Sequence, residues 1–312
     1  MIHKIYYNMR PIFPRWLQIM LRRRYVNNKR NIYKNIWPID KIASTPPDDW
    51  KGWPNNKKFA LILTHDVEQK KGQQKCWSLM EIEHELGFRS CFYFVPERYN
   101  VSVELRNHLY RLGFEVGVHG LKHDGKLYKS RKIFQQRAIK INEYIKTWGA
   151  VGFRSPAMHH NLAWMHDLNI EYDASTFDTD PFEPQPDGVR TIFPFWVTKN
   201  EKFQGYVELP YTLTQDHNLF IIMRENNINI WKEKLGWIVK KGGMVLLNTH
   251  PDYMYFQNGK MKLEEYPVDF YKQLLLYIKE NYDGQFWHAL PREVAAFWKN
   301  EVMGLKNIMA KS

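Results

Sequence analysis

The segment that decides the fold is Phe59-Ala-Leu-Ile-Leu63, together with the residues that follow it, Thr64-His65-Asp66-Val67-Glu68. A short apolar run that ends in charged residues is typical of a buried strand whose carboxyl end reaches a functional edge. If the strand continues, Asp66 and Glu68 point to the same side. Two carboxylates at one place are costly unless a cation or a substrate proton binds them. We therefore expect chemistry at this strand end, and a plain loop with a helix cap is the alternative.

The rest of the chain alternates between short apolar runs and amphipathic stretches. Strands are predicted at 92–95, 114–118, 151–153, 206–209, 244–247 and 285–287. Helices are predicted at 73–87, 101–112, 131–148, 226–240, 264–281 and 291–300. Repeated strand–helix alternation predicts a parallel sheet, open or closed into a barrel. In such folds the chemistry gathers at the carboxyl ends of the strands.

Three further polar motifs directly follow predicted strands. His119 and His123 are four residues apart and converge on one metal ion if their segment is helical. Arg154 ends the fourth predicted strand, where its guanidinium can orient a carboxylate; an ordinary structural ion pair is the alternative. His250 follows the strand at 244–247, and an imidazole suits general acid or base chemistry near neutral pH.

Taken in order, these motifs resemble those of the NodB-type polysaccharide deacetylases, carbohydrate esterase family four. The resemblance covers residues 59 to about 290 and rests on the His-x-x-x-His pair, the Arg-x-Pro segment and the late Leu-x-x-His, in the family's order. It implies an α/β fold, a distorted (β/α) barrel of about seven parallel strands. It also implies metal-dependent removal of N- or O-acetyl groups from sugars, usually with zinc.

The resemblance implies catalytic roles for the residues that match the family's motifs. Asp66 matches the catalytic base, Arg154 the arginine that orients it, and His250 the general acid. Ala157 follows the Arg-x-Pro segment, so that its backbone N–H would help hold the oxyanion. Ala157 stands where the family usually has tyrosine, which changes one wall of the substrate groove. Asp173 lies in a segment that resembles the fourth motif and is expected to support the substrate or oxyanion contacts.

The metal-binding residues differ from the usual pattern at one position. His119 and His123 match the metal-binding histidines, whereas Val67 stands where the family usually has a second, metal-binding aspartate. Glu68 is the nearest carboxylate, and the same-side argument makes it the expected third ligand. The resemblance therefore implies a divalent metal, with zinc expected, held by Glu68, His119 and His123.

Charge divides the chain into two parts. The net charge is +12, but residues 1–58 hold 13 Lys/Arg against 3 Asp/Glu, whereas residues 59–312 hold 32 against 30. We therefore predict a basic N-terminal extension and linker at 1–58 and a catalytic domain at 59–312. A nucleic-acid-binding protein would carry its basic patch on the folded domain, so no nucleic-acid partner is expected. Two cysteines argue against a disulfide scaffold.

The extension contains an amphipathic stretch that runs from Trp16 to Leu21 and is followed by Arg22, Arg23 and Arg24. One interpretation is a short interfacial helix that brings residues 1–30 into peripheral contact with anionic lipid. The other is a helix packed on the main domain. Because no signal peptide or spanning segment is recognisable, the predicted location is cytoplasmic, with peripheral contact at the inner membrane surface. The sequence predicts no particular oligomeric state.

The leading hypothesis is an enzyme that hydrolyses C–N bonds other than peptide bonds. It would remove an acetyl group from an N-acetylated amino sugar in a polysaccharide or a lipid-linked glycan precursor. One alternative keeps the fold but takes a non-sugar amide, such as a ring amide or an acylated polyamine. The other is a non-catalytic carbohydrate-binding relative, which Val67 in a ligand position would suit. His160 and the loop at 177–186 are further candidates for substrate contact.

Overall fold

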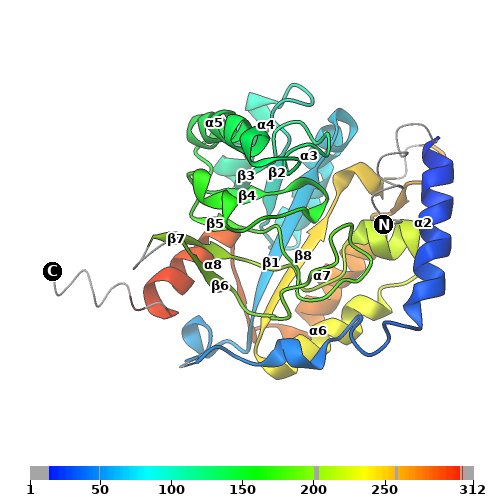
Figure 1. The fold of residues 1–312 in the computed structure, drawn as a ribbon. Helices are drawn as coiled ribbons and strands as arrows, with labels where there is room; N and C mark the ends of the chain where they lie inside the picture. Colours follow the sequence, from blue (N-terminus) through cyan, green and yellow to red (C-terminus); the bar gives the residue numbers. More distant parts are fainter. Residues whose placement is uncertain (1–13, 49, 200–203, 257–258, 303, 305–312) are drawn as a thin grey trace.

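A curled, mostly parallel sheet covered by helices forms the body of the molecule (Figure 1). The computed structural model describes residues 14–48, 50–199, 204–256, 259–302 and 304. The strands of the main sheet are β1 (Phe59–Val67), β2 (Cys91–Phe94), β3 (Glu115–His119), β4 (Gly152–Arg154), β5 (Tyr172–Asp173), β6 (Phe195–Thr198), β7 (Gly205–Glu208), β8 (Met244–Thr249) and β11 (Phe286–His288). A separate parallel pair joins β9 (Met254–Tyr255) and β10 (Tyr266–Pro267).

The helices lie around this sheet. The α-helices are α2 (Arg15–Arg30), α3 (Lys70–Glu85), α4 (Val103–Arg111), α5 (Arg131–Trp148), α6 (Asn229–Lys241), α7 (Asp269–Tyr282) and α8 (Pro291–Phe297). Shorter 3-10 and π turns are η2 (Lys41–Ser44), η3 (Pro54–Asn56), η4 (Pro156–Met158), η5 (Trp164–Asp167), η6 (His217–Ile222), η7 (Pro251–Tyr253) and η8 (Trp298–Val302). Helices α4 and α5 pack beside β3, and α6 packs beside β8.

The strand order shows how the sheet curls. It runs β11-β1-β2-β3-β4-β5-β7-β6, with β8 on the other side of β1, and every pair is parallel except β6 with β7. Beyond β7, the backbone N–H groups of Thr212 and Leu213 donate to the carbonyl of Leu246 in β8. The sheet therefore bends back toward its own first strands, and the predicted distorted (β/α) barrel is confirmed.

Burial explains why β1 is the centre of this sheet. All nine of its residues are buried, because it pairs with β8 along one side and with β2 and β11 along different halves of the other. The strand also runs through Val67, four residues beyond the apolar run at 59–63. The neighbouring strands β2, β3 and β8 are buried throughout as well, as expected for a sheet covered on both faces.

The described part of the N-terminal extension packs on this body. On α2, Ile19 and Val26 are buried, and α2 lies along η6. Further on, Trp37 packs edge-on against Phe182 and donates its indole N–H to Thr214. The packed-helix interpretation therefore describes α2. None of the helices in the described residues combines the length and apolar character needed to span a bilayer.

Candidate active site

The carboxyl ends of β1, β3, β4 and β8 bring the predicted catalytic side chains together. Asp66 lies near the end of β1, His119 and Arg154 are the last residues of β3 and β4, and His250 follows β8. All four are at most 5% exposed. The expectation that polar residues at these strand ends meet in space is therefore met.

Asp66 sits at the centre of this group. Its Oδ1 lies 3.3 Å from Nη1 of Arg154, and its Oδ2 accepts a hydrogen bond of 2.8 Å from the side-chain amide of Asn248. The Nε2 atoms of His119 and His250 lie 3.9 and 3.8 Å from the same Oδ2. Asn248 was not among the predicted residues, although it follows the apolar run of β8 directly.

These neighbours keep Asp66 ionised in spite of its burial. Burial alone would raise the pKa of the carboxyl group, because a charge is poorly solvated in the interior. The electrostatic interactions with His119, Arg154 and His250 act in the opposite direction, and so does the Asn248 hydrogen bond, so that the pKa of Asp66 is lowered. An anionic carboxylate with two imidazoles nearby can accept a proton from a polarised water molecule.

Glu68, His119 and His123 form the one cluster among the described residues that could hold a metal ion. Each offers a ligand atom, and these atoms lie within 4.8 Å of one another. His119 is oriented for this role, because its Nδ1 lies 3.1 Å from the carbonyl oxygen of Arg154 while its Nε2 is buried without a hydrogen-bond partner among the described residues. Burial lowers the pKa of His119 to about 4. A neutral imidazole with a free, buried nitrogen fits a divalent metal.

The two histidines converge as expected, but through a turn and not through the helical segment that we had given as the condition for it. His119 ends β3, and both Gly120 and His123 have positive φ, at 60° and 52°. The turn still brings the imidazole centroids to 5.2 Å. Gly120 is needed there, since a Cβ atom would lie only 2.6 Å from Cδ of Pro156.

Glu68 lies just past β1 and faces the same site as Asp66. Its Oε1 lies 3.0 Å from Nε2 of His123, and its Oε2 accepts a hydrogen bond of 2.9 Å from the hydroxyl of Tyr253. Its backbone N–H donates to Oδ2 of Asp252 at 2.8 Å. Burial opposes ionisation, but the charge and the hydrogen bond of His123 set the pKa of Glu68 well below its usual value. A carboxylate held at both oxygens is well placed as a third ligand.

His250 is paired with a residue that the sequence reasoning missed. Its Nδ1 lies 2.6 Å from Oδ1 of Asp216, and Oδ2 of Asp216 accepts from the backbone N–H of His250 and from the hydroxyl of Tyr266. Burial would lower the pKa of His250, but the charge and hydrogen bond of Asp216, helped by Glu68 and Asp66, raise it to about 10. His250 is therefore a cation at neutral pH and can donate a proton from Nε2.

Ala157 and Asp173 lie in the segments that support Arg154. Ala157 has a φ of 55° in the η4 turn, directly after the Arg154-Ser155-Pro156 segment. Asp173 is fully buried and accepts a hydrogen bond of 2.6 Å from Ser175, whose hydroxyl accepts from the backbone N–H of Ser155. Asp173 thus lies behind the site and can act only by holding this segment, so its predicted place among substrate contacts needs correction.

The other candidates for substrate contact are held by the protein itself. Nδ1 of His160 lies 2.9 Å from the carbonyl oxygen of Met158. In the loop at 177–186, Asp180 and Glu183 are buried and accept hydrogen bonds from Tyr211 and Asn218. These contacts are structural.

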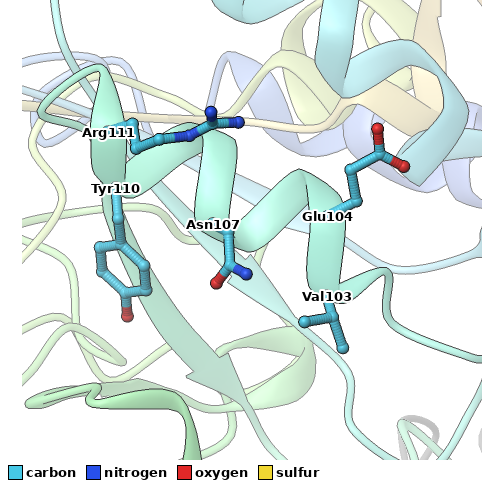
Figure 2. A pocket seen from close by; sticks show the side chains of 5 residues that line it. All are labelled: Val103, Glu104, Asn107, Tyr110 and Arg111. Atoms are coloured by element: carbon cyan, nitrogen blue, oxygen red, sulfur yellow. The ribbon is translucent and has the colours of Figure 1, made fainter.

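A hollow of about 710 Å³ lies elsewhere, over α4 (Figure 2). Its lining side chains all come from that one helix: Val103, Glu104, Asn107, Tyr110 and Arg111. None of the residues described above lines it, so it has no part in the candidate site.

Comparison with solved structures identifies the fold. A putative polysaccharide deacetylase from Mycobacterium smegmatis aligns with a TM-score of 0.63 and 16% identity over 81% of this chain and 93% of its own. A probable polysaccharide deacetylase from Pseudomonas aeruginosa PAO1 aligns with a TM-score of 0.65 and 14% identity over 85% and 99%. PuuE allantoinase aligns with a TM-score of 0.65 and 14% identity over 85% and 98%.

No family model and no curated protein matches the sequence. At identities this low, the structural likeness concerns the arrangement of the chain. The chain therefore has the fold of the NodB-type polysaccharide deacetylases, carbohydrate esterase family four.

Proposed function

We propose that this protein is a metal-dependent hydrolase that removes the acetyl group from an N-acetylated amino sugar. The observation that carries the proposal is that residues able to bind a metal lie beside residues able to transfer protons. A cluster able to hold a metal, formed by Glu68, His119 and His123, lies beside an anionic carboxylate, Asp66, and a cationic imidazole, His250. Metal-assisted hydrolysis of an amide uses each of these parts.

The donor set fits a divalent metal, with zinc as the expected ion. Two imidazoles and one carboxylate also suit cobalt, nickel or iron. When bound, such an ion would lower the pKa of a coordinated water to about 7 and polarise the acyl oxygen. The protein orients the ligands: the carbonyl oxygen of Arg154 contacts Nδ1 of His119, and the hydroxyl of Tyr253 donates a hydrogen bond to Glu68.

Proton transfer is divided between Asp66 and His250. Asp66 takes the proton of the attacking water, because Arg154 and Asn248 keep it ionised and fix its orientation. His250 gives the proton of its Nε2 to the leaving nitrogen, because Asp216 keeps the imidazole protonated. The backbone N–H of Ala157 completes the site by stabilising the oxyanion. The products are acetate and a free amine on the sugar.

An acetate-release assay tests this function. Chelator-treated protein should release no acetate from a panel of N-acetylated sugars, polymers and lipid-linked precursors, and addition of zinc should restore release from at least one class. Release that is unchanged by chelation, or its absence from every member of the panel with metal supplied, would contradict the proposal.

A non-sugar amide is the second candidate substrate class. The similarity to PuuE allantoinase favours it, because the TM-score equals that of the Pseudomonas deacetylase. Assays with cyclic amides and acylated polyamines, run beside the sugar panel under the same metal conditions, separate the two classes. A non-catalytic role is disfavoured by Glu68, which supplies the carboxylate that Val67 cannot.

We also propose a cytoplasmic protein that contacts the inner membrane surface through α2. The arginines Arg22, Arg23 and Arg30 hydrogen-bond to the body, so the contact would rest on the exposed Arg24 and on apolar side chains. Trp16, Met20 and Leu21 are 57%, 50% and 40% exposed. Replacing Trp16 and Met20 by serine should lower co-sedimentation with anionic vesicles, and an unchanged pellet fraction would contradict the membrane contact.

A further inference from the structure

The inside of the barrel carries a buried tyrosine next to the candidate site. Residues that are register partners on neighbouring strands point to the same face of a sheet. Tyr93 in β2 is the register partner of Asp66 in β1 and of Gly117 in β3. Its side chain therefore points into the barrel, as that of Asp66 does, and it is fully buried there.

The ring of Tyr93 lies against the guanidinium of Arg154. Nε of Arg154 donates 2.8 Å to the carbonyl of Ala174, and Nη1 donates 2.6 Å to Oδ1 of Asn248. Nη2 is buried and has no hydrogen-bond partner among the described residues. The Tyr93 ring adds a contact of another kind, because its centroid lies 4.6 Å from Cζ of Arg154. A guanidinium is attracted to the face of an aromatic ring, and the attraction grows when both groups are shielded from water.

A chain of hydrogen bonds holds the Tyr93 ring in place. Its hydroxyl donates 2.9 Å to the hydroxyl of Tyr172, which donates 2.8 Å to Oε1 of Glu115. Oε2 of Glu115 accepts the backbone N–H of Arg292 at 3.1 Å and lies 3.3 Å from its Nε. Both tyrosines and Glu115 are fully buried. The ring is therefore tied to two further strands and to α8.

Two strand glycines make room for these rings. A Cβ atom on Gly117 in β3 would lie 2.4 Å from Cδ1 of Tyr93, and one on Gly152 in β4 would lie 2.0 Å from Cζ of Tyr172. Neither glycine has a positive φ, so the requirement at both positions is space. Glycine inside a strand marks such a close approach. The strands that carry His119 and Arg154 are thus shaped around the two tyrosine rings.

We infer that Tyr93 is a positioning residue for the reaction: its ring, held through Tyr172 by Glu115, fixes the guanidinium of Arg154, which in turn orients Asp66. This inference rests on the proposed function and adds a residue outside the motifs from which the site was predicted. Tyr93 acts through Arg154. Loss of its ring should therefore slow the chemical step without weakening the binding of zinc or substrate, since catalysis is more sensitive than binding to small displacements of a reacting group.

Steady-state kinetics of acetate release by zinc-supplied protein test this role. Tyr93→Leu removes the ring and should lower kcat roughly tenfold or more, with KM and zinc affinity unchanged. Tyr93→Phe keeps the ring face and should recover most of this loss. Phe94→Leu is the matched control, because Phe94 is equally buried on the same strand but points to the opposite face. It should lose stability as Tyr93→Leu does and keep the wild-type kcat. A wild-type kcat in Tyr93→Leu, or the same loss in Phe94→Leu, would overturn the inference.

An NMR measurement on ¹⁵N-labelled protein tests the contact without substrate. The Nε–H signal of Arg154, identified by its absence in Arg154→Lys, should move downfield in Tyr93→Leu as the ring is lost, and should stay in place in Phe94→Leu. Tyr172→Phe removes the hydroxyl that joins Tyr93 to Glu115 at nearly unchanged volume. It should also move the signal, and it supplies the result if Tyr93→Leu does not fold. An unmoved signal would overturn the inference. These shifts in a protein that releases no acetate would contradict the proposed function but not the positioning of Arg154 by Tyr93.

Discussion

The Nδ1 atom of His250 lies 2.6 Å from Oδ1 of Asp216, and the same carboxylate accepts the backbone N–H of His250. Two hydrogen bonds from one residue to one carboxylate fix both the orientation and the protonation of the imidazole. Oδ2 of Asp216 also accepts a hydrogen bond from Tyr266, so the carboxylate itself is held in place. The proton donor of the proposed reaction is therefore built from segments some 34 residues apart.

Replacing Asp216 by asparagine should lower the turnover number and change its pH dependence. Because Asp216 raises the pKa of His250 to about 10, the protonated acid persists in the wild type until the pH rises through that value. Without the carboxylate, the alkaline limb of the rate profile should move toward lower pH, and turnover at neutral pH should fall roughly 10²-fold or more. The profile of kcat against pH measures both effects. An alkaline limb in the same place would show that His250 is not the acid.

Replacing His119 by alanine should abolish metal uptake and turnover together. The variant loses the imidazole whose buried Nε2 has no partner among the described residues, and with it one of the two nitrogen ligands. Metal content after dialysis, measured by mass spectrometry, is the readout. His84→Ala is the control, since His84 is exposed on α3 and should leave metal content unchanged. An active, metal-free His119→Ala protein would refute the ligand assignment.

Replacing Gly120 by alanine should destabilise the protein and weaken metal binding. Gly120 has a φ of 60°, and a Cβ atom there would lie 2.6 Å from the Pro156 ring. Gly125→Ala is a matched control: Gly125 also has positive φ, at 71°, but a Cβ atom there would meet nothing within 4 Å. In both variants the free energy of unfolding should fall by about 1 kcal/mol, because alanine disfavours positive φ. In Gly120→Ala it should fall clearly further, because of the contact with Pro156. Equal melting temperatures for the two would show that the contact with Pro156 is unimportant.

Replacing Gly72 by alanine should destabilise the protein, although replacing a glycine within a helix by alanine usually stabilises it. Alanine usually stabilises a helix interior by about 1 kcal/mol relative to glycine. At Gly72, however, a Cβ atom would lie 2.2 Å from Oδ2 of Asp252, the atom that accepts the Glu68 N–H. Gly236→Ala in α6 is the control, where the nearest atom is 3.7 Å away. Chemical denaturation should show Gly236→Ala stabilised and Gly72→Ala destabilised; stabilisation of both would contradict the packing described here.

Much of the fold could be predicted because the residues that begin and end the helices, and the apolar runs of the buried strands, are recognisable in the sequence. The helix at 131–148 has the predicted bounds, since Ser130 caps its start and Gly149 adopts φ 64° at its end. The buried runs at β1, β2, β3 and β8 were also found, because strands covered on both faces are apolar throughout. In contrast, β6 was missed, since it is a half-exposed antiparallel edge strand without a continuous apolar run.

The candidate site could be predicted only where a side chain lies at the carboxyl end of a buried strand. Asp66, His119, Arg154 and His250 lie at such ends, and they meet as expected. Asp216 does not: it follows the irregular segment that reaches β8 from β7, and no periodic pattern marks that segment as part of the barrel wall.

The turn at His123 was missed for a related reason. Spacing alone does not distinguish one helical turn from a loop that passes through positive φ at Gly120 and His123. The packing of α2 on the body is equally invisible in the sequence, because it depends on contacts such as that of Arg22 with Asn218, 196 residues apart.

The central claim, that Glu68 completes a metal site in place of the residue at Val67, is tested most directly by zinc titration calorimetry. We predict that chelator-treated wild-type protein binds a single zinc ion per chain, and that Glu68→Ala binds it at least tenfold more weakly. Zinc binding of equal affinity and stoichiometry in the wild type and in Glu68→Ala would contradict the account.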